Sequence, residues 1–195
     1  MTTTMDRLDP KELFRFFYPE DTPLRRLLQH HSEQVCQKSL ELLEHSGLPL
    51  DASLVEAGAL LHDIGVGQCH APSILCQGTE HYLRHGLLGA QMLQKYGREN
   101  GCLTRMEPLA RICERHTGTG LDREEILQQK LPLPPRDFLP LTPEEKLVCL
   151  ADKFFSKSGN MEEKSLDRIL HGLEKFGPKT LERFHDMCRL FRIEA

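Results

Sequence analysis

Apolar residues recur along this chain at intervals of three and four, and almost never at intervals of two. Intervals of three and four place side chains on one face of an α-helix, whereas intervals of two place them on one face of a β-strand. The fold class is therefore expected to be all-α. Capping residues and glycine or proline stops then divide the chain. The expected helices lie at 11–17, 23–46, 51–63, 79–96, 104–116, 122–130, 142–157, 163–176 and 178–191, with a loop at 68–78 and a proline-rich connection at 131–140.

The length of 195 residues suits a single domain of ordinary size. Apolar residues make up 39% of the chain and charged residues 28%, so the chain can bury a core. We expect an N-terminal helical extension at 1–21, a central helical domain at 22–157, and C-terminal helices at 158–195 that pack on the same core.

Charge and composition narrow the class of protein. A formal net charge of −4 lacks the basic footprint of a nucleic-acid binder. No apolar run approaches the roughly 20 residues that cross a bilayer, and the first residues show no secretory signal. The seven cysteines are odd in number and form no Cys-x-x-Cys pair, which favours free thiols in a reducing compartment. We expect a cytoplasmic protein that binds neither nucleic acid nor membrane.

Polar residues interrupt the apolar stripes of five expected helices. In the helix at 23–46, for example, His31 occupies the same face as Leu24, Leu28 and Val35. Burying such a group costs a few kcal/mol, of order ~2–7, unless it is paired. The full set consists of His31, His62, Asp63, His85, His116 and Asp152.

A lone histidine on an apolar face is usually a core residue bonded to a backbone carbonyl, and each of these residues alone could be explained in such a way. Their coincidence on five helices points instead to one shared partner. A cation bound by neutral imidazoles and carboxylates supplies that partner. The adjacent pair His62 and Asp63, just before Gly65, is the most specific part of this pattern. Two residues adjacent in sequence can both reach one ion only where the helix ends and the chain changes direction.

Five short segments, in this order, resemble the motifs of the HD-domain superfamily of metal-dependent phosphohydrolases. The Leu-Leu-His-Asp-Ile-Gly string looks like the signature of its HDIG subgroup, and the chain is similar to the small stand-alone members of that subgroup. The resemblance covers about 22–157, which makes the central domain an HD domain. The segments are His31-x3-Val35, Leu60–Gly65, His85-x3-Gly89-Ala90, Arg115–Gly118 and Leu150–Lys153.

The resemblance implies a single-domain helical bundle around a metal site. In such proteins the positions that match His31, His62, Asp63 and Asp152 bind one metal ion. The positions that match His85 and His116 bind a second ion, and Asp63 bridges the two. The expected cofactors are then one or two divalent transition metal ions, among Mn, Fe, Zn, Co and Ni.

The expected activity is that of a phosphohydrolase, a phosphomonoesterase or phosphodiesterase acting on a small phosphoester such as a nucleotide. Two such ions sit about 3.5–4 Å apart and hold a hydroxide at neutral pH that attacks phosphorus in line. We assign the catalytic roles to Asp63 and His62. Three cations adjacent in sequence to ligands are candidates for binding the substrate phosphate: Lys153, Arg115 and Arg84.

Two alternatives of other classes remain open. A di-iron oxygenase can use the same six-ligand pocket for oxygen chemistry. A non-catalytic signalling module can retain the metal site without turnover. Neither the substrate nor the oligomeric state can be inferred from the sequence.

Overall fold

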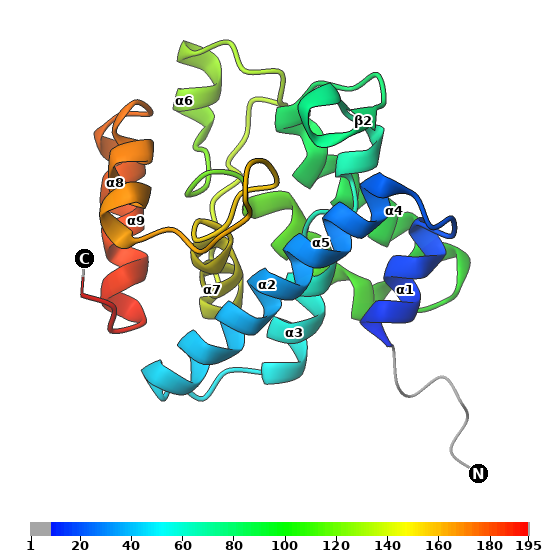
Figure 1. Cartoon of the computed structure of the whole chain (residues 1–195), viewed down its shortest axis with the longest axis horizontal. Helices are drawn as coiled ribbons and strands as arrows, with labels where there is room; N and C mark the ends of the chain where they lie inside the picture. Colours follow the sequence, from blue (N-terminus) through cyan, green and yellow to red (C-terminus); the bar gives the residue numbers. More distant parts are fainter. Residues whose placement is uncertain (1–8, 195) are drawn as a thin grey trace.

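The computed structural model describes residues 9–194, and helices dominate it (Figure 1). The expected all-α fold class is confirmed. Residues 1–8 of the expected N-terminal extension, and residue 195, lie outside the described residues. The α-helices are α1 (Pro10–Phe17), α2 (Pro23–Ser46), α3 (Ala52–Leu61), α4 (His85–Glu99), α5 (Leu103–Arg115), α6 (Arg123–Gln128), α7 (Pro143–Asp152), α8 (Leu166–Glu174) and α9 (Pro178–Leu190).

The helix boundaries that depend on local capping lie where the sequence predicts them. The side chain of Thr22 accepts a hydrogen bond from the Arg25 amide and begins α2, and Thr142 begins α7 in the same way. Gly47 ends α2 in the left-handed conformation, with φ of 66°.

The predicted helix at 79–96 differs from the structure at both ends. A short 3-10 helix, η3 (Tyr82–Arg84), precedes α4, and α4 then continues through Gly97 to Glu99. A β-carbon at Gly97 would lie 2.8 Å from Cα of Leu103. The glycine therefore permits close packing of α4 on α5 and does not end the helix.

Two further expectations are wrong in detail. The predicted loop at 68–78 contains short 3-10 turns, η1 (Val66–Gln68) and η2 (Pro72–Ile74), and a two-residue antiparallel hairpin of β1 (His70–Ala71) and β2 (Cys76–Gln77). The helix predicted at 142–157 ends at Asp152 instead. The chain after Asp152 leaves the helix axis and can return towards the interior.

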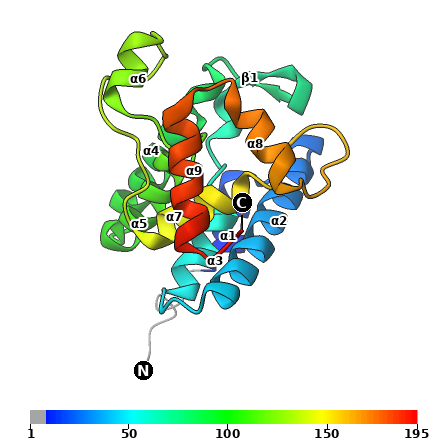
Figure 2. The same cartoon turned by 90° about the vertical axis from the view of Figure 1, so that its left-hand side faces the viewer.

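Two core clusters meet at α3. One joins α2, α3 and α7 to the C-terminal helices, and includes Val55 and Phe184. The other joins α1, α3, α4 and α5, and includes Phe14 and Leu61. The helix α9 packs on α7, and α8 packs on α9 (Figure 2). The limits of the central domain, at residues 22 and 157, stay predictions.

No helix within residues 9–194 combines the length and the apolar character needed to cross a bilayer.

Candidate metal centre

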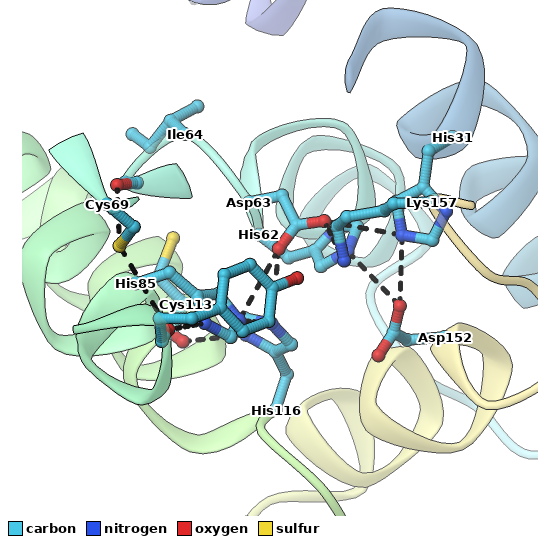
Figure 3. Close-up of polar contacts among 12 residues, drawn as sticks. His31, His62, Asp63, Ile64, Cys69, His85, Cys113, His116, Asp152 and Lys157 are labelled. Carbon is cyan, nitrogen blue, oxygen red and sulfur yellow. Dashed lines mark hydrogen bonds and ion pairs between the residues drawn. The ribbon is translucent and has the colours of Figure 1, made fainter. Parts of the chain in front are cut away.

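The six polar residues singled out in the sequence lie together in the interior (Figure 3). All six are buried. They form two groups that share Asp63, and within each group the candidate ligand atoms lie within 4.8 Å of one another. The first group is His31, His62, Asp63 and Asp152, and the second is Asp63, His85 and His116.

Helix ends position most of these side chains. His31 projects from the middle of α2, whereas Asp152 is the last residue of α7 and His85 the first residue of α4. His62 and His116 are the residues directly after α3 and α5. Five helices therefore converge on one point, and four of them begin or end there.

Three of the histidines are oriented by the same local device. The Nδ1 atom of each donates to the backbone carbonyl three residues earlier, which can only accept. The Nε2 atom of each ring consequently faces the cluster, as is typical of metal-binding histidines. The bonds are His62 to Ala59 at 2.6 Å, His85 to Tyr82 at 2.7 Å and His116 to Cys113 at 2.7 Å.

The carboxylate of Asp63 faces both groups at once. Its Oδ1 atom lies 3.5 Å from Nε2 of His85 and 3.4 Å from Nε2 of His116. Its Oδ2 atom lies 3.3 Å from Nε2 of His31 and 3.1 Å from Nε2 of His62. This is the arrangement that a bridging carboxylate requires.

The two groups differ in their protonation. Burial alone would lower the pKa of His62, but the carboxylates of Asp63 and Asp152 outweigh burial and raise that pKa to about 9. Burial and the neighbouring His116 lower the pKa of His85 to about 3. Burial also lowers the pKa of His116. Near neutral pH, therefore, His85 and His116 are neutral, and the Nε2 atom of each carries a lone pair.

The cluster fits a bound cation. The Nε2 atoms of His85 and His116 lie 2.9 Å apart with both lone pairs inward, which is repulsive unless a positive charge sits beside them. Within the described part of the chain, Nε2 of His62 and Oδ1 of Asp63 are buried without a hydrogen-bond partner. Each such atom costs about 1–3 kcal/mol. Imidazole nitrogens and carboxylate oxygens suit divalent transition metals, so the buried cluster suits a divalent metal ion.

Lys157 is a component of the site that sequence reasoning missed. Its Nζ atom lies 2.6 Å from Oδ2 of Asp63, and its side chain is 10% exposed. Burial would lower the pKa of Lys157, but Asp63 raises it well above its ordinary value and keeps the ammonium charged. The sequence predicts a helix that continues to residue 157, whereas Lys157 reaches Asp63 because α7 ends at Asp152.

The three predicted phosphate-binding cations lie in different surroundings. Lys153 is close to the cluster, with Nζ 2.8 Å from Oδ2 of Asp152. Arg84 pairs with Glu80 at 3.0 Å, and both residues are partly buried. Arg115 pairs with Glu145 at 2.9 Å. The structure thus brings only Lys153 of the three into contact with a candidate ligand among the described residues, and all three roles stay predictions.

Glu145 ties together two of the helices that carry the cluster, because Arg115 extends from α5 and Glu145 lies in the first turn of α7. Glu145 is 3% exposed, and it also accepts a hydrogen bond from the Leu141 amide at 2.8 Å. Glu145→Ala would remove the nearer carboxylate partner of Arg115 and leave only Glu114, at 3.9 Å, so the free energy of unfolding should fall by about 3 kcal/mol. Urea unfolding measures the change, and Glu99→Ala on the surface should alter it by less than about 0.5 kcal/mol. Equal stability of the two variants would contradict the assignment.

Loading the metal-free protein near neutral pH is expected to release about one proton per chain, because a metal ligand must be deprotonated. The proton comes from His62, whose pKa is raised to about 9. In the absence of metal this raised pKa stabilises the fold fully below pH 6.5, and the contribution is lost as the pH rises through about 9. Titration calorimetry in two buffers of different ionisation enthalpy counts the protons. His30→Gln, at the exposed neighbour of His31, should leave the count unchanged; a count near zero in the wild type would refute the assignment.

Residues 28–156 match the HD domain family. The chain is 34% identical over 148 residues to an uncharacterised protein of Methanocaldococcus jannaschii, in a match that covers 74% of each protein. It is 35% identical over 160 residues to a tRNA (cytidine(56)-2'-O)-methyltransferase of Picrophilus torridus, covering 82% of this chain and 38% of that protein. A protein of the same name from Thermoplasma volcanium is 38% identical over 127 residues, which are 65% of this chain and 31% of that protein.

The chain thus spans about a third of the length of the two methyltransferases. No solved structure matches the sequence.

Proposed function

This chain belongs to the HD domain family, and we propose that it is a metal-dependent phosphohydrolase that cleaves a small phosphoester. The observation that carries the proposal is the position of Asp63 between two groups of buried ligands. A carboxylate shared in this way is typical of two-metal sites that hydrolyse phosphoesters. The HDIG subgroup and the cytoplasmic location are parts of the same proposal.

The cluster would hold two metal ions with the ligands divided as the structure divides them. His31, His62 and Asp152 would complete one site with Asp63, and His85 and His116 would complete the other. When bound, such ions lower the pKa of a water molecule and polarise a phosphoryl oxygen.

The chain's own residues contribute orientation and charge. Asp63, 1% exposed, fixes the two groups relative to each other and, with His62, would orient the attacking group. The ammonium groups of Lys153 and Lys157 lie at the edge of the cluster and would neutralise the oxygens of the substrate phosphate. Both line a cavity of about 690 Å³ that Asp152 also borders. This volume falls in the usual range for small-molecule sites, about 300–1,000 Å³.

The methyl transfer named for two relatives is not part of the proposal, because this chain spans only about a third of those proteins. Their names do favour including nucleoside 2'-, 3'- and 5'-monophosphates among the test compounds. That the chain binds neither nucleic acid nor membrane stays a prediction.

The test combines elemental analysis of the purified protein with a phosphoester panel of aryl phosphates and nucleotides. We expect one or two transition metal ions per chain and metal-dependent release of phosphate or of an alcohol. Oxygen consumption by an iron-loaded protein without phosphoester turnover would favour the oxygenase instead. A metal-loaded protein that turns over none of these compounds would refute the proposal and favour a binding module.

A further inference from the structure

The cavity in front of the metal cluster is bordered on one side by residues outside the family match at 28–156. Lys157, Lys164 and Arg168 all line it, and Arg168 lies in the first turn of α8. Figure 2 shows α8 as a separate helix beside α7. The C-terminal segment therefore shapes this cavity together with the metal-binding domain.

The lining carries an excess of positive charge. Among the described residues that line it, four are cationic, and Asp152 is the one carboxylate. Lys153 is paired with Asp152, and Lys157 with Asp63. The two remaining cations, Lys164 and Arg168, form no ion pair with a carboxylate among the described residues. The cavity is therefore locally positive, although the net charge of the protein is −4.

Two backbone carbonyl groups hold the side chain of Lys164 at the edge of the cavity. Its Nζ atom donates to the carbonyl of Lys153 at 2.9 Å and to the carbonyl of Phe155 at 2.8 Å. These bonds hold the chain that turns back after α7, and with it the two lysines beside the cluster. Burial lowers the pKa of Lys164 to about 8, and neighbouring cations, Arg168 among them, add to that effect.

Among the cations that line the cavity, Arg168 is the one whose side chain has no partner in the described part of the chain. The residue is exposed, and its guanidinium makes no hydrogen bond or ion pair with any residue in 9–194. A guanidinium presents a planar fork of donors that matches the oxygens of a phosphoryl group. Arg168 lies four residues after Lys164, beyond the N-cap residue Ser165, and adds a second positive centre to the lining of the cavity.

We propose that Arg168, with Lys164 behind it, forms a second anion subsite. The preferred substrate then carries a second phosphoryl group, as in a nucleoside diphosphate or triphosphate, in addition to the group held at the metal cluster. This inference rests on the proposed function, because the first group is placed at the cluster. It makes the segment after residue 157 a determinant of specificity.

The binding test uses the metal-loaded full chain and needs no turnover. Orthophosphate, pyrophosphate and tripolyphosphate are titrated calorimetrically at fixed ionic strength. The wild type should bind pyrophosphate about tenfold more tightly than orthophosphate, the equivalent of one charge-assisted contact. Arg168→Gln should abolish most of this preference and leave the affinity for orthophosphate unchanged, and Arg168→Lys should restore part of it.

Arg98→Gln is the matched control, because Arg98 is an exposed arginine near the end of α4 that does not line the cavity. Any removal of metal by the polyphosphates would affect this variant and Arg168→Gln alike. Equal affinities of the wild type for orthophosphate and pyrophosphate would overturn the proposal. Identical behaviour of the two arginine variants would also overturn it.

A kinetic test separates this inference from the proposed function. With a nucleoside diphosphate as substrate, Arg168→Gln should raise KM about tenfold with little change in kcat, while the monophosphate is unaffected. If no phosphoester is turned over but the pyrophosphate preference depends on Arg168, the proposed function fails and the anion subsite stands. If turnover occurs and Arg168→Gln treats both substrates as the wild type does, the subsite fails and the proposed function stands.

Discussion

Replacing Asp63 with alanine is expected to remove both the metal and the turnover. Its two carboxylate oxygens face four imidazole Nε2 atoms at distances between 3.1 and 3.5 Å, so one substitution removes a ligand from both groups. Metal content should fall to near zero, and turnover should fall by on the order of a thousandfold. Elemental analysis and phosphoester assays on the same preparation measure the two effects together.

The alanine variant also leaves the ammonium of Lys157 without its partner at 2.6 Å, which destabilises the fold in its own right. Asp63→Asn keeps the shape and one oxygen, so it separates loss of metal from loss of folding. Asp122→Asn, at a partly buried carboxylate that caps α6, is the matched control and should retain the wild-type metal content. Full metal content in a folded Asp63→Asn protein would contradict a shared ligand.

The cluster could be predicted from sequence because burying a polar side chain is unfavourable without a partner. His31 lies on an apolar face of α2, and its ring is fully buried in the structure. The argument needs only helical periodicity, and α2 satisfies it because Thr22 and Gly47 fix both of its ends locally. The division into two groups came from the family resemblance, and the structure shows the same division in space.

Lys157 could not be predicted because its position depends on a tertiary contact. Local periodicity continues the helix of α7 to residue 157, since Phe155 falls on the same stripe as Val148. In the structure the side chain of Lys164 bonds to the carbonyls of Lys153 and Phe155, which a continuing helix would use for its own amides. The helix therefore ends at Asp152, and Lys157 reaches Asp63.

Adjacency in sequence to a ligand does not by itself place a cation beside the cluster. Neighbouring residues on a helix point about 100° apart, so a residue beside a ligand normally faces elsewhere. Arg115 is the last residue of α5, and it pairs with Glu145 rather than with the cluster. Lys153 directly follows α7, where the chain turns, and its ammonium contacts Asp152.

Gly65→Ala is expected to destabilise the protein and to disrupt the second group of ligands. Gly65 has φ of −78°, which any residue adopts, so the requirement is for space. A β-carbon there would lie 2.1 Å from the carbonyl oxygen of His85 and 2.4 Å from the amide nitrogen of Gly89. Both are backbone atoms of α4, so relief of the clash requires the whole start of that helix to move.

Movement of α4 carries His85 away from Asp63, because His85 is its first residue. The free energy of unfolding should fall by about 2–3 kcal/mol, and metal content should fall with it, first at the site that contains His85 and His116. Gly172→Ala, in α8 with no atom within 4 Å of the added carbon, should instead be neutral or stabilising by up to about 1 kcal/mol. Urea unfolding and elemental analysis decide between these results. Wild-type stability and metal content in Gly65→Ala would show that α3 and α4 do not need this close approach to assemble the cluster.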